Sequence, residues 1–480
     1  MLHGKFKTYL AGYLPLNLIQ AFTSLGLVVV YTRLLVPEQY GRYALALIAM
    51  QWLQSLLFAW LHGGVARFYE ARRAPDRLPA LLTTAYGAGL CLSALVAVTA
   101  GLVALFLRGP WRWLVVAGLV SLIARSLLLV GVEAHRAARH VARYSLLEGT
   151  QSVLGLGLGA LLVLGTGGGA AAALWGIALA SVLVLLLDAP GQRSFIRLNA
   201  WSNDEMQRLA RYGMPLAAAG LLSQIIANSD RFFIAWLIGE KAVGLYSVAY
   251  TLVDRPLTIL FVWVAMAALP LAYVAMEREG TAAAHAVMEN TAKTLILLML
   301  PCTAGLAAVA APLAAVVVGV EFREQTAHLI PWIALASLLS GATVHYTAHA
   351  FLITENTRLL LLSNLLVAIL YTALNLLLIP AYGLDGAVAA SIIAYALGFA
   401  FQCFLARRFL PVPLLGSHFI RAVLACGVLV ALITAAGLPT TLGGLMLSIL
   451  LGIVAYGISA LALNVADSRS WLMARWRRDG

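Results

Sequence analysis

Long apolar runs, separated by short polar breaks, follow one another along nearly the whole chain. A helix needs roughly 20 mostly apolar residues to cross a hydrocarbon core of about 30 Å. The pattern therefore predicts an all-α membrane protein with about 14 transmembrane helices. The runs lie near residues 9–31, 43–66, 79–107, 112–134, 145–164, 170–187, 213–238, 244–274, 292–319, 329–353, 359–379, 384–405, 421–437 and 442–463.

Composition excludes a soluble domain. Hydrophobic residues make up 62% of the chain and charged residues 11%, whereas a soluble protein carries about 25% charged residues. The formal net charge of +12 comes from basic residues in the breaks, such as Arg136, Arg139 and Arg143. Because most of these clusters fall in alternate breaks, the positive-inside rule predicts that both termini are cytoplasmic, and we expect no nucleic-acid partner.

Two pairs of matching segments indicate an internal repeat. The first pair follows the first and seventh runs, where Gly41, Tyr43 and Ala46 correspond to Gly244, Tyr246 and Ala249. The second pair of matching segments is 175–181 and 385–391. Six helices separate the copies, so both start on the same side of the membrane, and such halves usually enclose a site between them. The predicted units are a six-helix bundle at 1–190, a cytoplasmic linker at 191–211, a second six-helix bundle at 212–406, and two extra helices with a basic tail at 407–480.

The linker carries a helix-start signal. Ser202 and Glu205 have the spacing of a capping box, which predicts a short interfacial helix ending near Arg211. The tail at 471–478 mixes aromatic and basic residues, as expected of an anchor at the level of the lipid headgroups.

No pattern indicates catalysis, a metal or a cofactor. The four cysteines lie inside apolar runs without the spacing of metal ligands. His345 and His349 share a helix face but lack the intervening glutamate of a zinc-protease helix, which favours a polar packing pair. Gly165 to Gly169 lacks the Lys-Ser/Thr of a phosphate loop. We therefore expect no cofactor, no metal site and no catalytic residue.

Three segments carry a resemblance to a known family: Arg33 to Tyr43, Asp230 to Tyr250, and Tyr382 to Ala387. With the length and helix count, they make the chain similar to the polysaccharide or O-antigen (oligosaccharide) flippases of the multidrug/oligosaccharidyl-lipid/polysaccharide exporter superfamily. The resemblance implies a two-bundle, V-shaped transporter of the bacterial inner membrane. It would carry a lipid-linked, polyprenyl-diphosphate oligosaccharide to the periplasmic leaflet through a cationic central cavity, for surface polysaccharide such as O-antigen lipopolysaccharide and beside other assembly proteins.

Polar residues inside the predicted spans are the candidate site. An arginine at mid-span costs roughly 3 kcal/mol on insertion scales, so such residues should face protein or water. We expect the arginines to attract a diphosphate headgroup and the amide side chains, which form polar stripes at helical spacing, to bond sugar hydroxyls. The candidate substrate-binding residues are Arg125, Arg231, Arg255, Asn17, Gln20, Gln224 and Asn228.

The acids beside two of these arginines leave alternatives open. Asp230 and Asp254 could couple an ion to transport, or they could pair with Arg231 and Arg255 and lock the seventh and eighth helices together. Arg125 has no acid at helical spacing except the distant Glu133, which favours a headgroup role. Two alternatives to a flippase remain: an ion-coupled small-molecule exporter of the same superfamily, and a membrane-embedded glycan polymerase, which the short outer loops disfavour.

Overall fold

The chain folds entirely into helices over the residues that the structure, a computed structural model, describes. These are residues 2–69, 77–192 and 196–469, with the side chains of 2–14, 17 and 198 excepted. The predicted tail anchor at 471–478 lies outside them. The predicted all-α class is confirmed.

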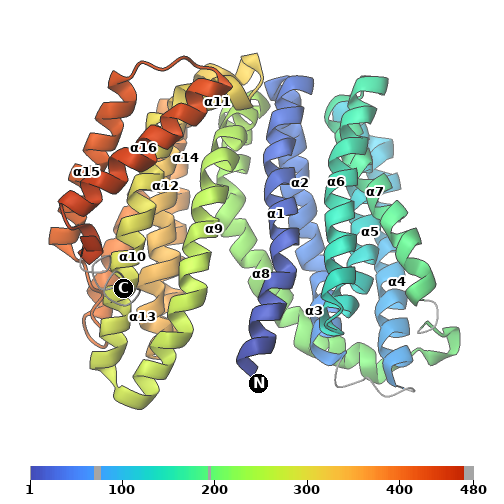
Figure 1. The fold of residues 1–480 in the computed structure, drawn as a ribbon. Coiled ribbons are helices and arrows are strands. Elements are labelled where there is room, and N and C mark those ends of the chain that lie inside the picture. Colours follow the sequence, from blue (N-terminus) through green and yellow to red (C-terminus); the bar gives the residue numbers. More distant parts are fainter. Residues whose placement is uncertain (1, 70–76, 193–195, 470–480) are drawn as a thin grey trace. The chain divides into compact units, whose positions relative to one another are not determined.

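Figure 1 shows the helices in chain order. The first part of the chain forms α1 (Leu2–Leu34), α2 (Pro37–Leu57), α3 (Ala59–Phe68), α4 (Arg77–Phe106), α5 (Pro110–Ala137), α6 (Val141–Thr166), α7 (Gly169–Gln192), the 3₁₀ turn η2 (Leu198–Ala200) and α8 (Asn203–Ile238). The rest forms α9 (Glu240–Glu279), α10 (Thr281–Ala308), α11 (Ala310–Val317), η3 (Val320–Phe322), α12 (Arg323–Ala342), the π-helical turn η4 (Thr343–Thr347), α13 (Ala348–Ile353), α14 (Thr357–Ala406), α15 (Gly416–Ala435), α16 (Leu442–Ala462) and η5 (Val465–Asp467).

Ten helices in the described residues are long and apolar enough to cross a membrane, or eleven if the bent pair α2 and α3 is one span. The exact count of 14 is not confirmed. Two predicted spans are not among these helices: α1 enters the count only as the apolar segment Leu18–Leu34, and α8 is long enough but is not counted as sufficiently apolar. Two others, at 359–379 and 384–405, lie together in α14, which is interrupted at Gly383.

α14 is a helical hairpin rather than one long helix. Gly383 has φ +61° and ψ −133°, a backbone conformation that breaks the helix and that glycine adopts without strain. Side chains then meet across the two arms: Gln402 donates to Ser363, and the rings of Tyr371 and Tyr395 lie 6.0 Å apart. The two predicted spans therefore run antiparallel.

The chain divides into two compact units, Met1–Phe232 and Phe233–Gly480, with the division inside α8. The domain boundaries drawn from the sequence, at 190, 211 and 406, stay a prediction. α8 begins at the predicted capping box, because the Glu205 amide donates to Ser202 Oγ at 3.4 Å. The helix does not end near Arg211 but continues to Ile238.

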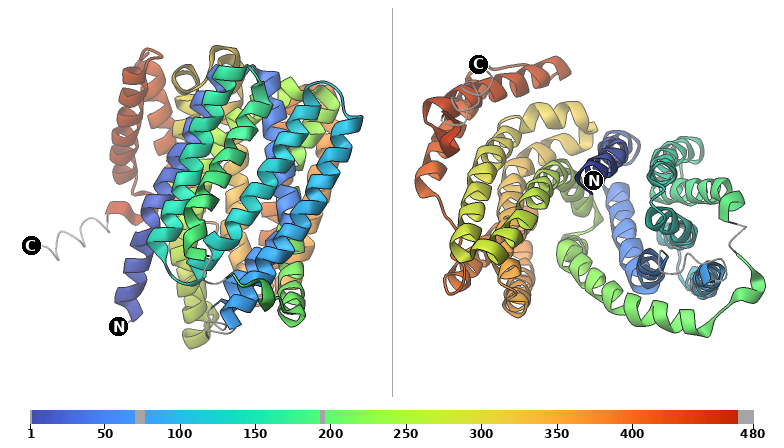
Figure 2. Two further views of the ribbon diagram at one scale, coloured as in Figure 1. Left: turned by 90° about the vertical axis from the view of Figure 1, so that its right-hand side faces the viewer. Right: turned by 60° about the horizontal axis from the view of Figure 1, so that its bottom comes forward.

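Glycines bring helices of the first unit into close contact. A Cβ atom at Gly176 of α7 would lie 2.2 Å from the backbone nitrogen of Gly159 on α6, and one at Gly213 of α8 would lie 2.1 Å from the carbonyl oxygen of Trp60 on α3. Small residues allow such backbone approach between helices in lipid. α6 and α7 consequently lie side by side along their length (Figure 2).

The second unit is built around α9, α10 and α12, which pack on one another. α15 and α16 lie next to each other (Figure 2, red) and cover α10 through a cluster that includes Ala425, Leu429 and Leu445. The repeated tyrosine of the sequence is buried in both units, since Tyr43 is 2% exposed and Tyr246 is fully buried.

Candidate functional site in the membrane helices

Arg125 on α5 forms an ion pair with Glu148 on α6. Its Nη2 donates to both carboxylate oxygens, at 3.0 Å to Oε1 and 2.8 Å to Oε2. The arginine side chain is 22% exposed and the glutamate 7%. Helical spacing offers Arg125 only the distant Glu133 as an acid on its own helix, and the acid that pairs with it comes from the neighbouring helix. Headgroup binding by Arg125 stays a prediction.

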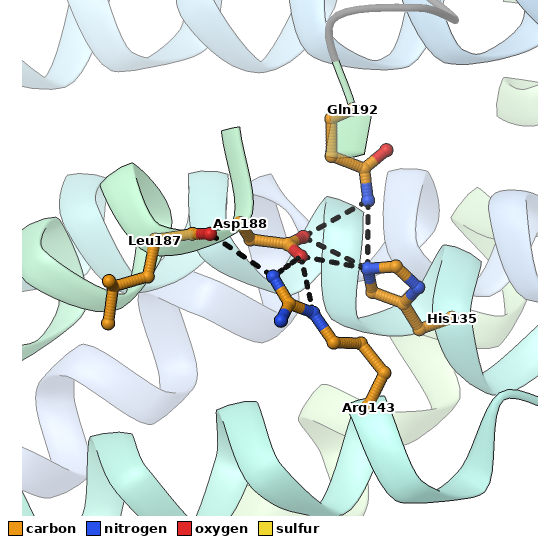
Figure 3. Close-up of polar contacts among 5 residues, drawn as sticks. All are labelled: His135, Arg143, Leu187, Asp188 and Gln192. Atoms are coloured by element: carbon orange, nitrogen blue, oxygen red, sulfur yellow. Dashed lines mark hydrogen bonds and ion pairs between the residues drawn. The ribbon is translucent and has the colours of Figure 1, made fainter. Parts of the chain in front are cut away.

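A second charged cluster joins the ends of α5, α6 and α7 around Asp188 (Figure 3). The Asp188 carboxylate, 2% exposed, accepts hydrogen bonds from His135 Nε2 at 3.0 and 3.1 Å, from Arg143 Nε and Nη2 at 3.1 and 3.0 Å, and from Gln192 Nε2 at 3.1 Å. Arg143 also donates to the Leu187 carbonyl at 3.1 Å. Each oxygen of this buried carboxylate therefore has charged or polar donors, as a buried charge requires.

The sequence reasoning missed the Asp188 cluster. The sixth predicted span ends at 187, just before Asp188, and Arg143 was treated only as one of the basic residues in a break. The signal available was an acid at the edge of a long apolar run, since such a residue needs a cationic partner. All of these residues lie at helix ends whose location in the cytoplasm is a prediction of the positive-inside rule.

Several polar residues of α8 form hydrogen bonds with other residues of that helix. Arg231, 7% exposed, donates through Nη1 to its neighbour Asp230 at 3.0 Å. Asn228 donates to the Gln224 carbonyl at 3.0 Å, and its amide lies 3.5 Å from Gln224 Oε1. The structure thus brings Gln224, Asn228 and Arg231 onto one stretch of α8, as their spacing predicts. Substrate binding by them stays a prediction.

The remaining predicted site residues have different surroundings. Asp254 of α9 is half-buried and accepts a hydrogen bond from Ser337 of α12 at 3.1 Å, and Arg255 is exposed. Gln20 is exposed on α1, and the side chain of Asn17 lies outside the described residues. Pairing of Asp230 or Asp254 across the seventh and eighth helices stays a prediction.

A buried amide network that the sequence did not reveal joins α14 to the turn before α13. Gln402, fully buried, donates to Ser363 at 3.2 Å and to Asn364 at 3.1 Å, and it accepts from the hydroxyl of Thr347. Nearby, His345 stacks on Phe261 with ring centroids 6.1 Å apart. In the described part of the chain, no three His, Cys, Asp or Glu residues are grouped in a way that could hold a metal ion.

The polysaccharide biosynthesis protein family matches residues 30–327. Comparison with curated protein sequences gave no match. Among solved structures, the lipid II flippase MurJ in an inward closed conformation is similar, with 14% identity and a TM-score of 0.73 over 94% of this chain and 98% of that chain.

Multidrug resistance transporters of the MATE family also share the fold. An inward-facing structure of the exporter superfamily has 16% identity and a TM-score of 0.59 over 81% of this chain and 94% of that chain. An outward-facing one has 16% identity and a TM-score of 0.55 over 84% and 96%. At such identities these likenesses establish the fold. With the family match they confirm the resemblance seen in the sequence: the chain belongs to the polysaccharide biosynthesis protein family and has the multi-pass membrane fold of the multidrug/oligosaccharidyl-lipid/polysaccharide exporter superfamily.

Proposed function

We propose that the protein moves a lipid-linked oligosaccharide from the cytoplasmic to the periplasmic leaflet of a bacterial inner membrane, for surface polysaccharide assembly. The observation that carries the proposal is the family match over residues 30–327, in a chain whose fold is shared with a lipid II flippase. The carrier would be a polyprenyl diphosphate. The protein would act as a transporter, not an enzyme, by alternating access of its two helical bundles.

The polar side chains inside the helices support this proposal. A sugar-phosphate headgroup cannot cross hydrocarbon without replacing its water shell, because each unsatisfied polar group costs several kcal/mol there. Arg125, Arg231 and Arg255 are cations on apolar helices, and Gln224 and Asn228 add amide donors and acceptors. These groups have the chemistry that a diphosphate and sugar hydroxyls need.

The proposed orientation places both termini in the cytoplasm. Arg136, Arg139 and Arg143 lie at the end of α5 and the start of α6, and the same end of α7 carries Asp188 and Gln192. A cluster of basic residues at these helix ends is typical of a cytoplasmic loop. Fusing a reporter that is active only in the periplasm after residue 139 should give no signal, and the same fusion after residue 109 should give one.

Deletion followed by leaflet fractionation tests the function. We expect lipid-linked repeat units to accumulate on the cytoplasmic leaflet of the deletion strain, where a membrane-impermeant sugar oxidant added outside does not reach them. Arg125→Ala should reduce translocation at unchanged protein level, with Arg136→Ala as the control for a lost surface arginine.

A normal leaflet distribution in the deletion strain would overturn the flippase proposal. If such a strain also lost efflux of a labelled small molecule, the ion-coupled exporter would take its place. If the purified protein elongated a lipid-linked sugar, the result would instead support a membrane-embedded glycan polymerase.

A further inference from the structure

The ion pair between Arg125 and Glu148 is incomplete on the arginine side. Both hydrogen bonds to the carboxylate come from Nη2. Within the described residues, Nη1 is buried and has no hydrogen-bond partner. A buried donor without a partner is unfavourable, so this guanidinium retains the capacity to bind a further oxygen.

The two members of the pair are also placed differently. The Arg125 side chain is 22% exposed, three times the 7% of Glu148, so more of the cation than of the carboxylate is accessible. Glu148 is its more deeply buried counter-ion. Glu133, about two turns further along α5, is already paired with Arg136 at 2.7 Å.

We propose that Glu148 is a positioning and specificity residue for anionic headgroups: it holds Arg125 while the site is empty and is displaced from it by the phosphate oxygens of the substrate. This inference rests on the proposed function. Glu148 engages only Nη2, and Nη1 is buried while the pair is formed. A diphosphate offers several acceptor oxygens and would bond Nη1 and Nη2 together once the guanidinium has turned away from Glu148. Neutral lipids lack the charge to compete with the carboxylate, so the pair selects for anions.

Displacement has a structural consequence inside the first unit. The pair connects α5 to α6. About one turn after Glu148 on α6, Ser152 donates to the Glu148 carbonyl, and Gln151 donates to the hydroxyl of Ser181 on α7 at 3.4 Å. Releasing Glu148 therefore removes a charged contact between α5 and α6 when the headgroup binds. The binding energy of the anion would be used to loosen this helix pair.

Binding of farnesyl diphosphate and farnesol to the purified full-length protein tests the proposal. The wild type should prefer the diphosphate. Glu148→Gln should bind it about fivefold more tightly, because the competing charge is gone and the shape is kept. The neutral pair Arg125→Gln with Glu148→Gln should keep its thermal midpoint and bind about tenfold more weakly. Glu289→Gln, which neutralises the carboxylate bonded to Lys293 at 3.0 Å in the second unit, is the matched control and should bind as wild type.

A charge reversal separates recognition from helix packing. The variant Arg125→Glu with Glu148→Arg keeps an ion pair between α5 and α6 and should fold, yet it should lose diphosphate binding and translocation. Full translocation by this variant would overturn the proposal, as would a wild type without preference for the diphosphate or a Glu148→Gln variant that binds no more tightly. The deletion strain decides the proposed function independently, because it reads leaflet distribution and not the strength of diphosphate binding.

Discussion

Replacing Asp188 by Asn should loosen the shared end of α5, α6 and α7. The substitution keeps the size of the side chain and removes its charge, while His135, Arg143 and Gln192 all lose a charged acceptor. Hydrogen bonds to charged groups contribute about 1.5–3 kcal/mol in soluble proteins, and interhelical ones in membranes average about 0.6 kcal/mol. Arg143 is 39% exposed, so its contribution is screened.

Together these contributions predict that Asp188→Asn lowers the free energy of local opening at these helix ends by about 2 kcal/mol, because asparagine keeps one acceptor oxygen for three donors. A local opening made easier by that amount speeds amide exchange by a factor of about 30. Hydrogen exchange of the protein in nanodiscs measures it, in peptides covering residues 132–145 and 184–192. α10 and α12 of the second unit should exchange as before.

Arg136→Gln is the matched control for this experiment. Arg136 is 48% exposed and pairs with Glu133 of its own helix, so its loss should cost under about 0.5 kcal/mol and change exchange less than about threefold. If Asp188→Asn and Arg136→Gln gave equal exchange at these helix ends, the buried carboxylate would not hold them together, and the reasoning from its burial would be refuted.

Three further predictions concern packing, capping and pH. Gly176→Ala should destabilise the packing of α6 on α7 by about 1–3 kcal/mol, because the new Cβ meets the Gly159 backbone. Gly157→Ala, with nothing within 4 Å of its Cβ, should be neutral or stabilising, and the fraction of folded protein left after heating in detergent compares the two variants. Ser202→Ala should cost about 1 kcal/mol through the lost cap of α8, seen as faster exchange confined to its first turn, and unchanged exchange there would contradict the capping bond. The hydrogen bond from Lys293 is the main cause that lowers the pKa of Asp467, so the contact between α10 and η5 should persist above the ordinary carboxyl pKa of 3.8 and be lost as the pH falls below it. Proteolysis after residue 464 should increase only below that pH, and Asp467→Asn should abolish this pH dependence.

Much of the fold follows from local pattern, because lipid imposes the same demand on every segment. A chain in hydrocarbon must satisfy its backbone within helices, so apolar runs of sufficient length predict them. Ser202 predicted the start of α8 for a similar reason, since a cap is decided within one turn. The predicted end of this helix was wrong. A short helix ending near Arg211 was expected before the apolar run at 213–238, but Leu209 and Gly213 pack against α3 and a single helix continues to Ile238.

Which side chains meet was decided by the tertiary structure alone. Helical spacing shows which residues share a face of one helix, and so it grouped Gln224, Asn228 and Arg231 correctly. It does not say which helix lies opposite that face. The pairing of Arg125 with Glu148, and of Asp188 with His135 and Arg143, depends on the rotation and adjacency of α5, α6 and α7, which close packing at residues such as Gly159 establishes. Composition and periodicity determine that charges in these helices need partners, and only the packed bundle supplies them.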